Sequence, residues 1–222
     1  MKRSIESYST LIFDCDGVVL DSNAVKTRAF YETALEFGQD AAEQLVAYHK
    51  ANGGVSRFKK FDYFLANIVK NVDPLPSREE LVEKYARKVR EGLVESRVEP
   101  NIDVMKRLTP DSNWLIVSGG AQDELRWVFS EKGIDVLFEG GIFGSPDSKE
   151  EILDREITKG NIVEPALFIG DSKYDYLAAK KYNIDFLFIK QWTEFAGWSE
   201  FCCSHNIIVC EELSDILKLE FD

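Results

Sequence analysis

Residues 10–17 read TLIFDCDG, a short apolar run that ends abruptly in two aspartates and a glycine. A run of this length and composition, bounded by a turn signal, predicts a buried β-strand. Asp14 and Asp16 then follow the last residue of the strand, where the chain must turn out of the sheet. The sequence therefore predicts a strand that brings two acids to one edge of a sheet.

Four further apolar runs have the length of strands, at 114–117, 166–169, 186–189 and 207–209. Helix-length segments with start and stop signals lie between the later runs, at 122–132, from 148 onward and at 172–182. Strands that alternate with such helices predict an α/β fold, a doubly wound parallel sheet with right-handed crossovers. In these sheets the ligand binds outside the carboxyl ends of the strands.

The segment 20–96 contains no convincing strand and is read as successive helices. The first is expected at 22–37, the second at 41–51, and the third carries apolar residues three and four apart between 58 and 68. A fourth begins at Ser77, where Ser77 and Glu80 form a capping-box pattern. The sequence thus predicts a small helical cap domain at 20–96, inserted into a core domain made of 1–19 and 97–222.

The charge balance limits the possible partners. With 27 basic and 39 acidic side chains, the formal net charge of −12 repels nucleic acid and anionic lipid, so we expect neither as a partner. No signal peptide or membrane-length apolar run is visible, and the four cysteines fit reduced thiols in a cytoplasmic protein. An anionic substrate would need local cations and a metal. The sequence leaves the oligomeric state open between monomer and homodimer.

Asp14 and Asp16 are the first candidates for chemistry. Two carboxylates this close cannot both stay ionised unless a cation lies between them or one binds a proton. Asp14 fits a nucleophile and magnesium ligand, and Asp16 fits an acid that protonates the leaving oxygen and later deprotonates water. The alternative is a polar loop after a strand.

Three later motifs also follow predicted strands. Ser118 and Gly119, before a helix, resemble a phosphate cradle or an ordinary loop. Asp171 and Asp175 can both approach a metal, although Asp175 could simply complement the helix dipole. Lys149 stands in the first turn of a helix, which is unfavourable for a cation, and either neutralises phosphate or is a solvated surface lysine. Parallel winding would bring all four motifs to one edge of the sheet.

With these motifs the chain resembles phosphatases of the haloacid dehalogenase superfamily, in the phosphoglycolate phosphatase-like and β-phosphoglucomutase-like branch that has a helical cap. Residues 11–22, LIFDCDGVVLDS, resemble the first motif of that family. Ser118 matches the second motif, Lys149 the third, and residues 170–175, GDSKYD, the fourth. The motifs span nearly the whole chain.

The resemblance implies a Rossmann-like core and an aspartyl-phosphate intermediate on Asp14. It further implies Mg²⁺ held by Asp14, the backbone carbonyl of Asp16 and Asp171, with Asp175 as a supporting acid. Two positions depart from the family pattern: the residue after Lys149 is not proline, and Cys15 replaces the more frequent Leu, Met or Phe. We expect Cys15 to be a buried strand residue and not a second nucleophile.

The expected function is hydrolysis of a small phosphorylated metabolite, such as a sugar phosphate, a sugar-acid phosphate or a phosphoglycolate-like compound. Two alternatives stay open: a β-phosphoglucomutase-like sugar-phosphate mutase, and a non-catalytic regulatory protein that binds a phosphorylated ligand. True dehalogenases resemble the pattern less because they lack an acid at the position of Asp16.

The cap is expected to act as a lid that sets substrate choice. Its candidate contact residues are Asn52, Gly53, Gly54 and Arg57, although a Gly-Gly break between helices is equally explained as a turn. The two histidines, at positions 49 and 205, are expected to be surface or packing residues.

Overall fold

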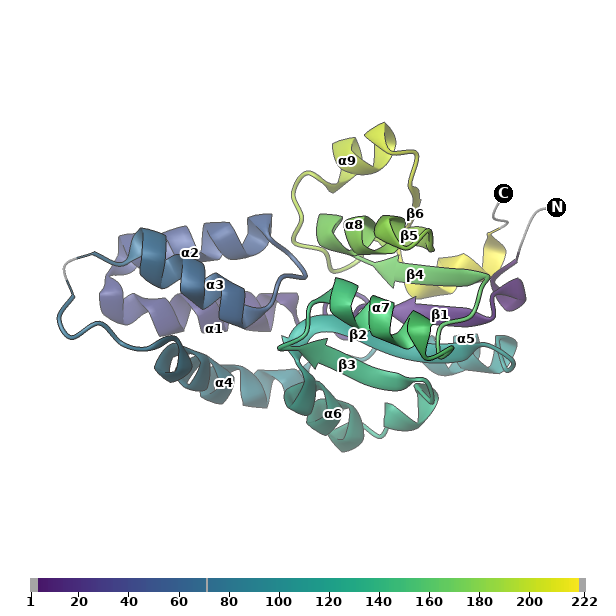
Figure 1. Cartoon of the computed structure of the whole chain (residues 1–222), viewed down its shortest axis with the longest axis horizontal. Helices are drawn as coiled ribbons and strands as arrows, with labels where there is room; N and C mark the ends of the chain where they lie inside the picture. The colour runs from purple at the N-terminus through teal and green to yellow at the C-terminus, as the bar shows by residue number, and fades with distance from the viewer. Residues whose placement is uncertain (1–3, 71, 220–222) are drawn as a thin grey trace.

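The structure is a computed structural model that describes residues 4–70 and 72–219. Within them, six parallel strands form one sheet in the order β3-β2-β1-β4-β5-β6 (Figure 1). This topology confirms the predicted α/β, Rossmann-like fold. The strands are β1 (Thr10–Phe13), β2 (Asn113–Ala121), β3 (Gly141–Ser145), β4 (Ala166–Gly170), β5 (Asp185–Ile189) and β6 (Ile208–Cys210).

Helices cover both faces of the sheet because successive strand residues point to opposite sides. Leu11 and Phe13 of β1 pack with residues of α5 and α6, whereas Ile12 packs with residues of α7 and α8. The sheet is therefore buried on both faces, as its uninterrupted apolar strands require. The core helices are α5 (Ile102–Leu108), α6 (Gln122–Glu131), α7 (Lys149–Thr158), α8 (Lys173–Lys181) and α9 (Trp198–Ser204), with short 3₁₀ turns η1 (Ile5–Ser7), η4 (Asp135–Leu137) and η5 (Leu213–Lys218).

All five predicted strands are present; β1 has the predicted limits, and the ends of the other four differ by at most four residues. The strand β3 was not predicted, because only Ile142 and Phe143 of its five residues are large and apolar. The short helices α5 and α9 were not predicted either. The predicted capping box between Ser77 and Glu80 is formed at the start of its helix.

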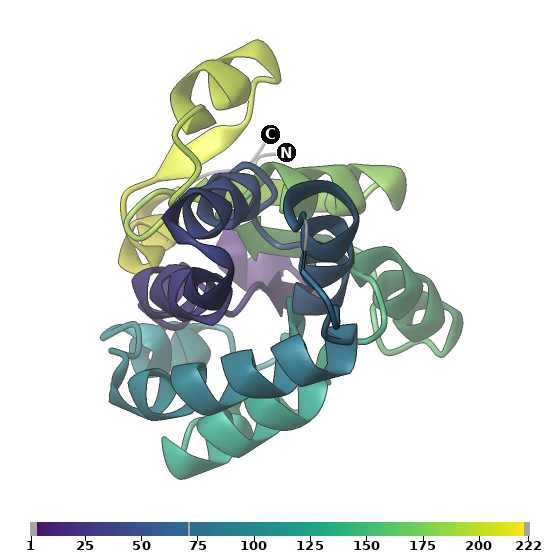
Figure 2. The same ribbon diagram turned by 90° about the vertical axis from the view of Figure 1, so that its left-hand side faces the viewer.

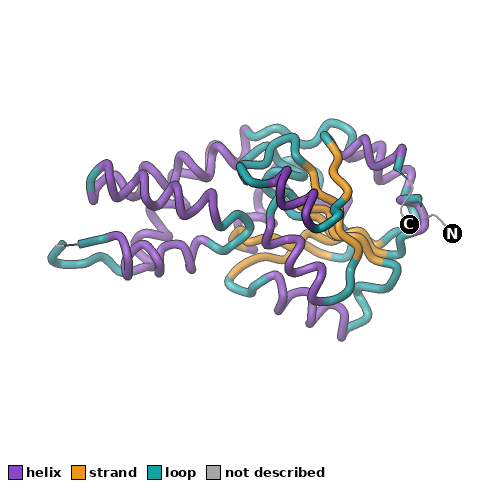
Figure 3. Tube along the Cα trace, turned by 90° about the horizontal axis from the view of Figure 1, so that it is seen from above, coloured by secondary structure: helices purple, strands orange, loops and turns teal. Residues whose placement is uncertain are grey.

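The segment between β1 and β2 consists mainly of helices. We call the first four, α1–α4, with the segments that connect them, the helical insert; α5 follows them and packs in the core. The strand arrows in Figure 1 point toward the insert, so it lies beyond the carboxyl edge of the sheet, and Figure 3 shows the same separation of helices and strands from above. Seen from its outer end, the insert stands in front of the sheet (Figure 2). Its elements are α1 (Asn23–Ala34), η2 (Leu35–Phe37), α2 (Gln39–Ala51), α3 (Arg57–Tyr63), a π-helical turn η3 (Phe64–Ile68) and α4 (Arg78–Glu95).

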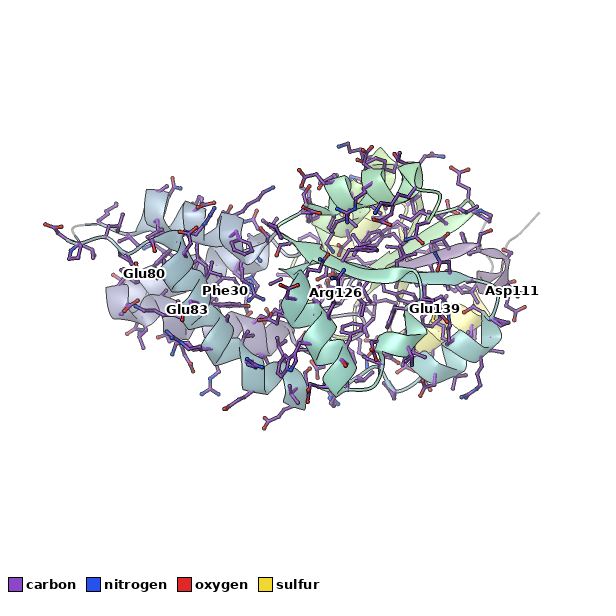
Figure 4. All side chains as sticks on the ribbon, turned by 60° about the horizontal axis from the view of Figure 1, so that its bottom comes forward. Phe30, Glu80, Glu83, Asp111, Arg126 and Glu139 are labelled. Carbon is purple, nitrogen blue, oxygen red and sulfur yellow. The ribbon has the colours of Figure 1, made fainter. Side chains whose placement is uncertain are left out.

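Aromatic side chains pack together inside the insert. The ring centroid of Phe30, which Figure 4 labels among the insert's helices, lies 4.4 Å from that of Tyr85 and 5.4 Å from that of Phe61. All three side chains are buried. This packing holds α1, α3 and α4 together, and it is continuous with the core that covers one face of the sheet.

Two chain segments connect the insert to the sheet, and they meet in an isolated antiparallel bridge between Leu20 and Val98. We propose that the division into a core (1–19 and 97–222) and a cap (20–96) falls at this bridge. Within the described residues, no helix combines the length and apolar character needed to cross a bilayer.

Candidate active site

The neighbouring strands β1 and β4 end side by side and bring two aspartates together. Phe13 pairs with Ile169, and the amide of Asp14 donates a hydrogen bond to the carbonyl oxygen of Ile169 at 2.9 Å. Asp171 follows β4 by one residue. The sheet order reverses between β1 and β4, which is the position where such sheets bind ligands. Carboxylate oxygens of Asp14, Asp171 and Asp175 lie within 4.8 Å of one another, and all three side chains are buried.

Lys149 comes from the first turn of α7 and reaches this cluster. It is 1% exposed; its Nζ lies 2.8 Å from Oδ1 of Asp14 and donates a hydrogen bond to Oδ1 of Asp175. Burial alone would lower the pKa of Lys149, but the charges of Asp14 and Asp175 outweigh it and raise that pKa. The structure therefore places Lys149 in the core, where the two acids favour its ammonium form, and not on the surface.

Asp175 both caps α8 and holds the lysine. Its Oδ2 accepts hydrogen bonds from the hydroxyl of Ser172 at 2.7 Å, the amide of Ser172 at 3.1 Å and the amide of Asp171 at 3.2 Å. A Cβ at Gly170 would lie 2.5 Å from that of Asp175, so glycine permits this close approach. With both oxygens engaged, Asp175 positions Lys149 and the 171–172 turn.

Ser118 and Gly119 follow the regular part of β2, next to β1. Ser118 is fully buried, and its Oγ accepts a hydrogen bond from the amide of Gly120 at 3.1 Å. A Cβ on Gly119 would lie only 2.0 Å from the carbonyl oxygen of Gly54 in the helical insert. The predicted phosphate cradle thus touches the insert directly, and only glycine fits there.

Burial and the neighbouring charges raise the pKa values of two acids in the cluster. Burial, with the nearby Asp175 and Asp16, raises the pKa of Asp14 to about 6 although Lys149 opposes the shift. Burial and the charges of Asp14 and Asp175 raise the pKa of Asp171 well above its usual value. A cation between the carboxylates of Asp14 and Asp171 would stabilise their ionised forms, which burial and mutual repulsion disfavour.

The residues present fit a magnesium ion. Hard carboxylate oxygens are its usual ligands, and two oxygens on opposite sides of one Mg²⁺ lie about 4 Å apart, which the cluster accommodates. Lys149 supplies one positive charge to a cluster of three carboxylates. The ionised cluster therefore keeps a net negative charge, which a metal cation would balance.

A family model described as haloacid dehalogenase-like hydrolase matches residues 8–183. This range contains β1, the helical insert and the whole acid cluster. The chain belongs to the haloacid dehalogenase-like hydrolases. No curated protein sequence gives a significant match.

Solved structures share the fold of this haloacid dehalogenase-like hydrolase at low sequence identity. A haloacid dehalogenase-like family hydrolase from Streptococcus pneumoniae is 20% identical, with a TM-score of 0.69 over 96% of this chain and 99% of that one. A predicted phosphoglycolate phosphatase from Haemophilus somnus is 17% identical, with a TM-score of 0.72 over 95% and 97%. CbbY from Rhodobacter sphaeroides, solved in complex with phosphate, is 18% identical, with a TM-score of 0.65 over 96% and 100%.

The hydrolase site also contains two residues of α1 that sequence reasoning missed. The side-chain amide of Asn23 donates to Oδ2 of Asp171 at 2.9 Å, and Lys26 forms a buried ion pair with Asp16. Burial alone would raise the pKa of Asp16, but Lys26 and the hydroxyl of Ser22 outweigh it and lower that pKa. The sequence signal that could have identified Asn23 and Lys26 is their position directly after the first motif, about one helical turn apart.

The predicted cap residues divide into two groups. Gly53, Gly54 and Arg57 line the main cavity of this hydrolase, whereas the side chain of Asn52 donates a hydrogen bond to the carbonyl of Tyr48 at 2.8 Å. Arg57 is 4% exposed and forms two hydrogen bonds with the carboxylate of Glu124 on α6. In this structure Arg57 therefore joins the insert to the core.

The cavity between the insert and the sheet edge encloses about 630 Å³ of empty space, part of it open to solvent. Asp14, Asp16 and Ser118 line it from the core, and side chains of α1, α2 and α3 line it from the insert. A concave site lined by polar side chains from both parts of the chain suits a small-molecule ligand. The cysteine between the two acids, Cys15, is buried but lies in the turn after β1 and not in the strand.

Proposed function

We propose that this haloacid dehalogenase-like hydrolase is a magnesium-dependent phosphatase that hydrolyses a small phosphorylated metabolite. The observation that carries the proposal is the buried cluster in which oxygens of Asp14, Asp171 and Asp175 lie within 4.8 Å, with the Lys149 ammonium 2.8 Å from Asp14. Acids, an ammonium and a glycine-rich turn at one cavity are the components that phosphoryl transfer needs.

Mg²⁺ would be held by Asp14, Asp171 and the backbone carbonyl of Asp16, with Asp175 behind them. When bound, it supplies positive charge that neutralises phosphoryl oxygens. On the protein side, Lys149 keeps its proton and binds the phosphoryl group electrostatically, because the two acids beside it raise its pKa. The helical insert excludes bulk water from the cavity during the reaction.

The reaction has two steps. A carboxylate oxygen of Asp14 attacks phosphorus, and the bond to the ester oxygen breaks while protonated Asp16 gives that oxygen a proton. Water then attacks the phosphorus of the aspartyl phosphate and transfers a proton to the Asp16 carboxylate. The bond between phosphorus and the Asp14 oxygen breaks, so inorganic phosphate is released and the Asp14 carboxylate is restored. Because Lys26 lowers the pKa of Asp16, the carboxylate form that the second step requires is favoured, and the first step proceeds through the minor protonated form.

Phosphate release from para-nitrophenyl phosphate, measured with and without Mg²⁺, tests the proposal. We expect activity only with the ion, and loss of at least about 10³-fold in Asp14→Asn because the nucleophile is gone. Asp103→Asn, which neutralises an exposed acid on α5, is the matched control. Mass spectrometry of acid-quenched wild-type enzyme should detect a phosphorylated protein. Turnover that survives in Asp14→Asn would contradict the assignment.

A further inference from the structure

Lys60 on α3 is a buried lysine at the main cavity. Its side chain lines the cavity while the residue is only 3% exposed. Its Nζ lies 2.8 Å from Nδ1 of His49 and 5.5 Å from the centroid of the Phe30 ring. In the described part of the chain no carboxylate lies within 4.0 Å of this ammonium. A buried cation without a counter-ion is costly and calls for a functional reason.

The other basic side chains that line the cavity differ from Lys60, because each has a carboxylate partner. The pairs are Lys26 with Asp16, Lys50 with Glu194, and Arg57 with Glu124. The protein therefore neutralises each of these cations within itself and leaves Lys60 to be neutralised by something else. The net charge of −12 makes this local cation the more necessary for an anionic ligand.

His49 orients this lysine and offers a second donor. Burial and the neighbouring lysines, Lys60 first among them, lower the pKa of His49 well below its usual value, so the imidazole is neutral. When Lys60 is an ammonium, Nδ1 of His49 must accept a hydrogen bond from it, which places the ring hydrogen on Nε2. Both residues line the same cavity as Asp14. Lys60 and His49 together thus form a cationic recognition element on the cap side.

We propose that Lys60, oriented by His49, binds a second anionic group of the substrate. The substrate is then a small phosphomonoester that also carries a carboxylate or a second phosphate, with the reacting phosphate at Asp14 and the other anion at Lys60. This assignment rests on the proposed phosphatase function and specifies its substrate class. Burial and the charge of Lys26 lower the pKa of Lys60 to about 7, and an arriving anion restores its ammonium form.

Three matched substrates test the proposal: propyl phosphate, 3-(phosphonooxy)propanoate, in which a carboxylate replaces the methyl group, and propane-1,3-diyl bisphosphate. With wild-type enzyme and Mg²⁺ we expect kcat/KM to be about 100-fold higher for the carboxylate or the bisphosphate than for propyl phosphate. Which of the two is preferred identifies the second anion. In Lys60→Met this preference should fall by about the same factor.

Lys59→Met is the control, because it removes an exposed lysine from the adjacent position of the same helix and should keep the wild-type preference. Equal kcat/KM for all three substrates in the wild type, or an unchanged preference in Lys60→Met, would overturn the role of Lys60 while leaving the phosphatase intact. Calorimetric binding of the same compounds to Asp14→Asn measures the preference without turnover. An affinity ratio near one there would also reject the proposal, even for a protein that hydrolyses no phosphomonoester.

Discussion

Replacing Lys60 by methionine should make the protein more stable, and the gain should depend on pH in a defined direction. The side chain is 3% exposed and has His49 as its hydrogen-bond partner. Burial is the main cause that lowers the pKa of Lys60 from 10.5 to about 7; Lys26 adds to it, and Asp16 and Asp14 oppose it. Methionine fills a similar volume and carries no charge, so the variant avoids the cost of burying the ammonium.

The magnitude follows from the difference in pKa between the unfolded and folded states. A shift of 3.5 units, from 10.5 to about 7, corresponds to about 5 kcal/mol at 1.36 kcal/mol per unit. Between those values the unfolded chain binds more protons, so wild-type stability rises with pH in that window. The full cost applies below pH 7 and fades toward pH 10.5. From pH 7 to pH 9 the wild type should therefore gain about 2 kcal/mol from Lys60, and Lys60→Met should gain nothing from this site.

Urea unfolding of both proteins at pH 7, 8 and 9 measures the difference in the free energy of unfolding between Lys60→Met and the wild type. In that range His49 stays neutral, because its pKa lies well below the usual value, and therefore does not contribute to the slope. The advantage of Lys60→Met over the wild type should shrink by about 2 kcal/mol as the pH rises. Lys59→Met should show no such trend, because this residue is exposed. A difference in the free energy of unfolding between Lys60→Met and the wild type that stays constant from pH 7 to pH 9 would refute the argument.

Two further predictions concern the metal and the contact between insert and core. Mg²⁺ at 100 times its dissociation constant should raise the free energy of unfolding of the wild type by about 2.7 kcal/mol, and Asp171→Asn should lose this response in urea titrations. Gly119→Ala should lower kcat/KM by at least about 100-fold, because the added Cβ would lie 2.0 Å from the carbonyl oxygen of Gly54 and force the insert away from the sheet. Activity within threefold of the wild type in steady-state assays would show that this contact tolerates a methyl group.

Much of the fold could be predicted because strand pattern and topology are local or follow general rules. The run at 10–13 is apolar at each position but the first, and the structure has a strand with the same limits. The strand Gly141–Ser145 escaped because it forms beside β2 through tertiary pairing and carries two glycines. Its sequence has too few apolar residues to predict a strand, although it pairs with β2 in the sheet.

The acids of the site could be predicted together for a related reason. Asp14 and Asp171 directly follow parallel strands, and pairing of those strands places their ends side by side regardless of helix packing. Lys26 and Lys60 lie on helices, so their direction depends on how each helix is rotated against its neighbours. His49 was expected to be a surface or packing residue, and it packs on Phe30 with centroids 4.5 Å apart, but its contact with Lys60 has no signal in the sequence.

The charges around the cavity are divided between the two parts of the chain. The sheet edge supplies the acids Asp14, Asp16 and Asp171, and the insert supplies the cations Lys26 and Lys60. Acids at the sheet edge favour a cation and hence the chemistry at phosphorus, which every substrate of such an enzyme shares. Because Lys26 is paired with Asp16, Lys60 is the cation of the two that favours negative charge elsewhere on the substrate, which differs from one metabolite to another. Because the insert and the sheet edge line one cavity, an anion bound by Lys60 would hold the insert against the core, and substrate recognition would be coupled to the exclusion of water from the reacting phosphate.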